Sequence, residues 1–171
     1  MIKIIGALMV FLSCALTGFE LSARLKKRAF SLKEIKMILE IILRDVSFFK
    51  TPVSEIFTLA GKKRESEAGE LFWLMGEKLK KNPELKESII KDELNKKRAA
   101  LCLSKSDINV LCDILLSLGT GDSLCQKNML ASGILSIESL ISESEENLKK
   151  NEKTYKSSGV LLGIFIVVLF V

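Results

Sequence analysis

Both ends of this 171-residue chain are strongly apolar, whereas charged residues fill the middle. The stretch Ile4–Phe19 contains no charge, and Gly159–Val171 is an unbroken apolar run. A membrane-spanning helix needs about 20 apolar residues to cross about 30 Å of hydrocarbon, so the second run needs its flanking residues to complete a span. The sequence therefore predicts transmembrane helices over residues 1–22 and 157–171, with a helical domain over residues 23–156 between them.

The positive charges predict on which side of the membrane the middle domain lies. Only Lys3 precedes the first apolar stretch, whereas eight lysines and arginines lie on the inner side of the two stretches. These expected topology determinants are Arg24, Lys26, Lys27, Arg28, Lys149, Lys150, Lys153 and Lys156. Because positively charged flanks stay in the cytoplasm, we expect a two-pass protein of the cell membrane whose middle domain is cytoplasmic.

A secretory signal is the alternative interpretation of the first apolar stretch. Residues 11–14, Phe-Leu-Ser-Cys, loosely resemble a lipoprotein cleavage box. In that case the chain is an exported helical lipoprotein or adaptor anchored through Cys14. The two interpretations place the middle domain on opposite sides of the membrane.

The middle of the chain has the apolar periodicity of helices and no alternation typical of β-strands. Apolar residues recur by threes and fours over residues 21–49, so the first membrane helix is expected to continue as an amphipathic helix. Residues 122–155 have heptad-like spacing and are expected to pair with that first helix or with another copy of the chain. The predicted fold class is all-α, a bundle of about six helices between the two terminal spans.

Capping patterns divide this bundle into its helices. Thr51-Pro52 and Asn82-Pro83 each join a capping residue to a proline at the first helical position. Ser104 followed by Asp107 imitates a capping box. Gly119 is expected to end the preceding helix in a left-handed conformation.

The residue types argue against catalysis. The chain has no histidine, and Cys102, Cys112 and Cys125 are too far apart for a CxxC pair, so we expect no metal and no cofactor. An enzyme that uses Cys125 or a glutamate cluster is a weaker hypothesis, because nothing supplies a base or an oxyanion site. The net charge of +5 is typical of a protein beside a membrane, and without aromatic residues among the basic runs we expect no nucleic-acid partner.

Several short stretches resemble one family over nearly the whole chain. They are Lys3-Ile4-Ile5-Gly6-Ala7 with Gly18-Phe19-Glu20, Thr51-Pro52-Val53, Leu118-Gly119-Thr120-Gly121-Asp122 with Gln126, and the lysine-rich approach to the short apolar C-terminus. On these residues the chain resembles the stage III sporulation protein AB family. That family is similar in its cytoplasmic part to the platform proteins of type II secretion and type IV pilus machines.

The resemblance implies a function and partners. It implies a non-enzymatic component of a secretion-like complex between mother cell and forespore, in the outer forespore membrane with its bundle on the mother-cell side. The implied partners are a cognate secretion-type ATPase and other membrane proteins of that complex, beside the lipid bilayer and further copies of the chain. The candidate partner-contact or structural turn residues are Thr51, Pro52, Gly119, Gly121, Asp122 and Gln126.

Overall fold

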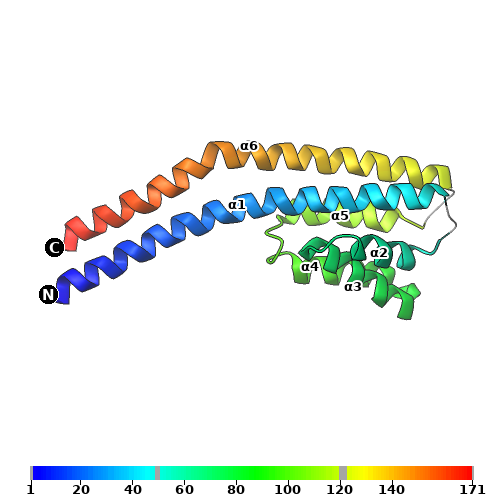
Figure 1. The fold of residues 1–171 in the computed structure, drawn as a ribbon, viewed down its shortest axis with the longest axis horizontal. Helices are drawn as coiled ribbons and strands as arrows, with labels where there is room; N and C mark the ends of the chain where they lie inside the picture. Colours follow the sequence, from blue (N-terminus) through cyan, green and yellow to red (C-terminus); the bar gives the residue numbers. More distant parts are fainter. Residues whose placement is uncertain (1, 49–50, 120–122, 171) are drawn as a thin grey trace. The chain divides into compact units, whose positions relative to one another are not determined.

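The computed structural model describes residues 2–48, 51–119 and 123–170, and every regular element among them is helical (Figure 1). The all-α prediction is therefore confirmed for these residues. The elements are α1 (Ile2–Phe48), α2 (Val53–Lys62), α3 (Glu67–Lys81), the 3-10 turn η1 (Pro83–Leu85), α4 (Lys86–Lys97), α5 (Lys105–Ser117) and α6 (Ser123–Phe170).

The chain divides into two compact units, and α1 and α6 contribute to both. The first unit consists of Met1–Lys27 and Glu143–Val171, and the second, which we call the bundle, consists of Arg28–Ser142. The predicted continuation of the first helix past residue 22 is confirmed, because α1 runs without a break from Ile2 to Phe48. The expected domain boundaries at residues 22 and 156 thus lie inside α1 and α6.

The first unit contains helix segments with exposed apolar side chains. Met9, Leu12, Leu16 and Phe19 of α1 are all exposed. Among the described residues, however, no helix combines the length and apolarity needed to cross a bilayer. The two transmembrane helices expected from the sequence are therefore not confirmed.

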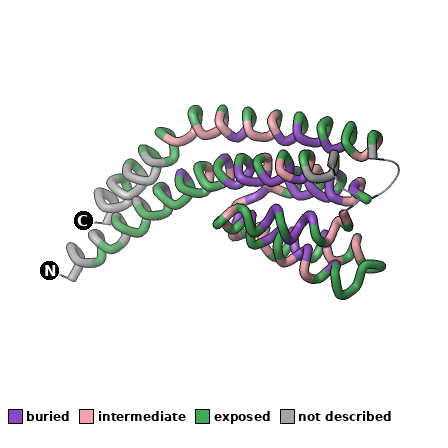
Figure 2. The backbone as a smooth tube through the Cα atoms, turned by 45° about the vertical axis from the view of Figure 1, so that its right-hand side comes forward, coloured by how far each residue is buried: buried purple, intermediate pink, exposed green. Residues whose placement is uncertain are grey.

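A single apolar core runs through the bundle and joins all six helices. From α1 it takes Leu32, Ile35, Ile38, Leu39 and Ile42, which are fully buried and spaced by threes and fours. In α6 the buried residues Leu130, Ile134 and Ile137 follow the spacing expected from the sequence. Figure 2 shows buried residues, in purple, along the helices of the bundle. The ion pair between Lys36 of α1 and Glu138 of α6, at 2.6 Å, confirms the first of the two predicted pairings, that of the last helix with the first, within the bundle.

Helices α2 and α3 approach so closely that glycine is needed at their contact. A Cβ atom added to Gly61 would lie 2.5 Å from the backbone nitrogen of Trp73. One added to Gly76 would lie 2.6 Å from the backbone nitrogen of Thr58. Backbone atoms cannot move aside as a flexible side chain can, so these two glycines set the distance between the helices.

The capping prediction is confirmed at the start of α5, is wrong at α2, and is confirmed in part at Asn82 and Pro83. Ser104 and Asp107 form a complete capping box at the start of α5. Helix α2, however, has Pro52 rather than Thr51 as its N-cap, because the ψ of 142° places Pro52 outside the helix. Its carbonyl oxygen accepts from the backbone N–H of Glu55 at 3.0 Å. Asn82 and Pro83 occupy the predicted N-cap and first position, but of the 3-10 turn η1 and not of α4, and no side chain caps that turn.

Candidate functional site

Four of the predicted partner-contact residues come together at one end of the bundle. The backbone N–H of Gly119 donates to the side-chain Oε1 of Gln126 at 3.1 Å, which fastens the end of α5 to the first turns of α6. A Cβ added to Gly119 would lie 2.9 Å from Cγ2 of Val53, the residue that follows Thr51 and Pro52. We call this surface, made by Thr51, Pro52, Gly119 and Gln126, the bundle tip.

The bundle tip is accessible and has a defined backbone. Pro52 and Gly119 are exposed, whereas Thr51 and Gln126 are half-buried. Gly119 has a φ of +78°, the left-handed conformation predicted for it, but the C-cap of α5 is Leu118 in an extended conformation. The other two predicted contact residues, Gly121 and Asp122, lie outside the described residues.

Lys86 also belongs to this end of the bundle, and sequence reasoning missed it. Its Nζ donates to the carbonyl oxygen of Leu116 at 2.8 Å and to the carbonyl oxygen of Leu118. The last carbonyls of a helix have no partner inside the helix, so a lysine there satisfies them and suits the helix dipole. Burial lowers the pKa of Lys86. A lysine 30 residues before its acceptor gives no local signal in the sequence.

Three buried carboxylates form ion pairs within the bundle. Arg28 donates to both oxygens of Asp107, at 2.9 and 2.8 Å, and the carboxylate is fully buried. Burial disfavours the charged form of Asp107, but hydrogen bonds from Arg28 and Ser104 outweigh it and lower the pKa. This pair holds α1 against the start of α5.

The other two buried carboxylates are Glu34 and Glu93. Glu34 of α1 accepts from Nε of Arg64 at 3.1 Å, and this hydrogen bond lowers the pKa of Glu34. Glu93 of α4 accepts from Lys78 at 2.7 Å and from Lys96 at 2.9 Å. Burial opposes the ionisation of Glu93, yet the two lysines keep its pKa below the usual value. Each carboxylate has an ionic partner, which is the arrangement of structural ion pairs.

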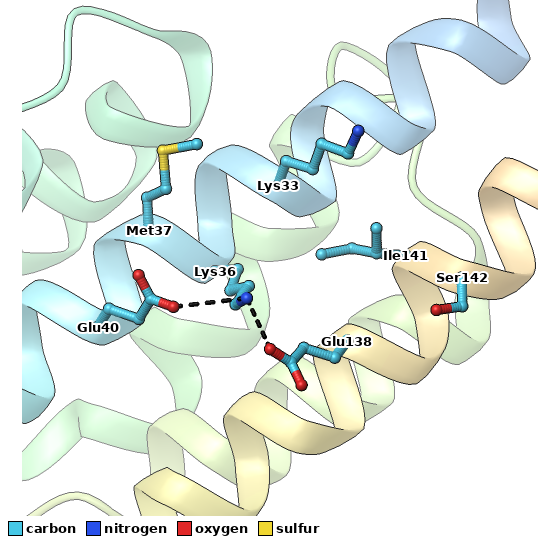
Figure 3. A pocket seen from close by; sticks show the side chains of 7 residues that line it. All are labelled: Lys33, Lys36, Met37, Glu40, Glu138, Ile141 and Ser142. Atoms are coloured by element: carbon cyan, nitrogen blue, oxygen red, sulfur yellow. Dashed lines mark ion pairs between the residues drawn. The ribbon is translucent and has the colours of Figure 1, made fainter.

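A groove of about 450 Å³ lies between α1 and α6 on the outer side of the bundle (Figure 3). Lys36 of α1 lies at its centre and contacts Glu138 of α6 at 2.6 Å and Glu40 at 3.5 Å. The hydrogen bond to Glu138 raises the pKa of Lys36. Lys33, Met37, Ile141 and Ser142 complete the lining. The groove therefore combines charges of both signs with apolar surface.

The predicted topology determinants take part in ion pairs in several cases. Arg24 contacts Glu20 at 2.7 Å, Lys26 contacts Glu152 at 2.7 Å, and Lys150 contacts Glu146 at 2.6 Å. Arg28 binds Asp107 inside the bundle, as described above. Lys27 also has an interaction, Lys149 and Lys153 are exposed, and the side chain of Lys156 lies outside the described residues. Their role in topology stays a prediction.

The three cysteines of the bundle have different surroundings. Cys112 is buried, and burial raises the pKa of its thiol. Cys102 and Cys125 are half-buried. In the part of the chain that the structure describes, no three cysteine, aspartate or glutamate side chains gather closely enough to hold a metal ion. A buried thiol with a raised pKa is a poor nucleophile, so Cys112 serves the core.

Comparison with known proteins matches this chain over almost its entire length. The family model for stage III sporulation protein AB (spore_III_AB) matches residues 3–171. The chain belongs to the stage III sporulation protein AB family. A curated relative, stage III sporulation protein AB of Bacillus subtilis (strain 168), is 24% identical over 169 residues, which is 99% of each chain.

A solved structure of stage III sporulation protein AB has the same fold. It superposes with a TM-score of 0.64 at 19% identity, over 71% of this chain and 96% of the solved chain. The family resemblance inferred from short sequence stretches is thus confirmed. The chain is a member of a sporulation family, with an all-helical fold in its described residues.

Proposed function

We propose that this member of the stage III sporulation protein AB family is a non-enzymatic platform in a secretion-like complex between mother cell and forespore. In this proposal, the bundle docks the cognate secretion-type ATPase in the mother-cell cytosol. Family membership supports a role in sporulation, and the bundle tip supports the docking. The observation that carries the docking proposal is the convergence of four predicted contact residues on one accessible surface.

The fixed backbone of the bundle tip and the apolar surface beside it suit recognition by a protein. The hydrogen bond to Gln126 and the two bonds from Lys86 fix its backbone before any partner arrives. A rigid surface loses little conformational entropy on binding, which favours affinity. Beside it, the side chain of Leu124 in the first turn of α6 is 66% exposed and offers apolar surface.

The proposal also includes anchoring in the membrane by both ends of the chain. The exposed apolar side chains of Met9, Leu12, Leu16 and Phe19 on α1, and of Leu161 and Phe165 on α6, support it. Exposed apolar surface of this kind is typical of a protein that contacts lipid or another protein. With positive flanks held in the cytoplasm, the bundle lies on the side where an ATPase finds its nucleotide.

Photocrosslinking tests the docking. A photoreactive residue replaces Leu124 beside the bundle tip in the full chain, and the same residue replaces Leu59 of α2 as the matched control, since Leu59 is 47% exposed. We expect a crosslink to the cognate ATPase from position 124 and none from position 59. Leu124→Glu is expected to reduce co-purification of the ATPase about tenfold, as loss of an interface anchor does, and Leu59→Glu is expected to leave it unchanged. Equal crosslinking from the two positions, or none from position 124, would contradict docking at the tip.

A further inference from the structure

The outward face of α1 in the bundle has a charge pattern that changes sign along the helix. Phe30, Lys33, Met37 and Glu40 recur by threes and fours, so they share one face, opposite the buried residues. All four are exposed, with Phe30 at 59% and Met37 at 41%. A lysine thus lies on one side of Met37 and a glutamate on the other.

This pattern is complementary to itself when a second copy is turned by 180°. Lys33 and Glu40 are seven residues apart, about 10.5 Å along the helix, and the midpoint between them lies beside Met37. In a two-fold dimer each contact occurs twice with the roles exchanged. An axis beside Met37 therefore brings Lys33 of each copy to Glu40 of the other and the two Met37 side chains together.

The groove beside this face gives the second copy a place to lie. Its α6 wall carries Glu138 and Ile141, and Figure 3 shows them across the groove from the side chains of α1. Glu138 holds Lys36 at 2.6 Å, whereas Glu40 is 3.5 Å from Lys36 and keeps further acceptor positions for another lysine. A methionine side chain adapts to irregular apolar hollows, so Met37 of the second copy suits the surface beside Ile141.

We propose that the groove between α1 and α6 is a homodimer interface, in which an antiparallel second copy pairs Lys33 with Glu40 about a two-fold axis beside Met37. The signs of the charges on one face favour a second copy over a partner of one charge, because only an occupant with the inverted order places an opposite charge at each end. The interface lies on α1 and α6 and uses none of the tip residues, so it does not depend on docking of an ATPase.

Charge reversal tests the proposal on the full chain in mild detergent, with mass measured by light scattering over a dilution series. Lys33→Glu and Glu40→Lys each place like charges together twice in the dimer, and each is expected to raise the dissociation constant about tenfold or more. The double variant exchanges both signs and is expected to associate nearly as well as the unchanged chain. Recovery in the double variant also shows that the single variants did not simply fail to fold.

Two further variants make the outcome decisive. The matched control reverses Lys81 and Glu84, which are exposed elsewhere in the bundle, and is expected to leave association unchanged. Met37→Cys, in a chain without the native cysteines, is expected to form a disulfide between copies, because the axis brings two copies of this position together. A monomeric unchanged chain at all concentrations, or a double variant as weak as the single ones, would overturn the proposal.

Discussion

At the scale of single residues, local patterns were readable from the sequence and distant partners were not. The capping box of Ser104 and Asp107 was predicted because both residues lie within one turn. Its ionic partner, Arg28, lies 79 residues away from Asp107, so only tertiary packing brings them together. From the sequence, Arg28 was interpreted as a topology determinant alone. The structure gives it a buried contact as well.

The buried pair of Arg28 and Asp107 predicts how stability depends on pH. The folded-state pKa of Asp107 lies below the ordinary value. The contribution of the Asp107 carboxylate to the free energy of unfolding is therefore fully present above about pH 4. It is lost as the pH falls through the lower folded-state pKa. Asp107→Asn leaves Arg28 without its ionic partner and is expected to cost about 3 kcal/mol at neutral pH.

Denaturant unfolding of the full chain at neutral and acidic pH measures this effect. The difference between the unchanged chain and Asp107→Asn is expected to shrink as the pH falls below 4, since protonation removes the same charge. The matched control is Glu146→Gln, because Glu146 forms an ion pair with Lys150 at the surface. The free energy of unfolding of that variant is expected to differ little from that of the unchanged chain, because exposed ion pairs contribute little to stability. If the difference in free energy of unfolding between Asp107→Asn and the unchanged chain does not vary with pH, the Asp107 carboxylate does not stabilise the fold.

At the scale of helices, apolar periodicity predicted the helices themselves. It did not predict where the backbones of two helices come into contact. Within the bundle, the spacing in α1 and α6 predicted most of the buried residues, because a helix brings every third or fourth residue to one face. Outside the bundle it was wrong for Leu21 and Tyr155, which are exposed. The close approach of α2 and α3 was not predicted. Gly61 gives no periodic signal, and its role depends on Trp73, a residue of the neighbouring helix.

Two glycine variants test whether backbone contact sets the spacing of the helices. Gly61→Ala places a methyl group 2.5 Å from the backbone nitrogen of Trp73, so α2 and α3 must separate. We expect a loss of about 2 kcal/mol in the free energy of unfolding, as for overpacking of a core. Gly133→Ala is the control, because its methyl group meets only side-chain atoms of Ile114, at 2.7 Å.

The comparison between the two variants decides the outcome. Both glycines lie inside helices, so the gain in helix propensity of about 1 kcal/mol from alanine applies to both variants. Ile114 can adopt another rotamer, whereas the backbone of Trp73 cannot move aside, so Gly133→Ala is expected to cost much less than Gly61→Ala. Equal losses measured by denaturant unfolding would mean that α2 can shift as readily as a side chain. The close contact would then not fix the distance between α2 and α3.

At the scale of the whole molecule, the all-helical class and the family followed from the sequence. Only helical periodicity occurs, and the turn motifs around Pro52 and Gly119 were specific enough to indicate the family. The bundle tip was predicted as a set of residues, but its shape was not, because Val53 and Lys86 reach it from distant parts of the chain. The groove between α1 and α6 was missed, since it needs the register of the two helices.

In the proposed function, the bundle of the platform lies in the cytoplasm between two membrane anchors. Single cysteines replacing Ser106 and Ser139, both exposed in the bundle, test it in a full chain without the four native cysteines. Intact cells are treated with a membrane-impermeant maleimide before and after permeabilisation. We expect both positions to stay unlabelled until the membrane is permeabilised. Prompt labelling in intact cells would contradict it and favour the exported helical lipoprotein or adaptor anchored through Cys14.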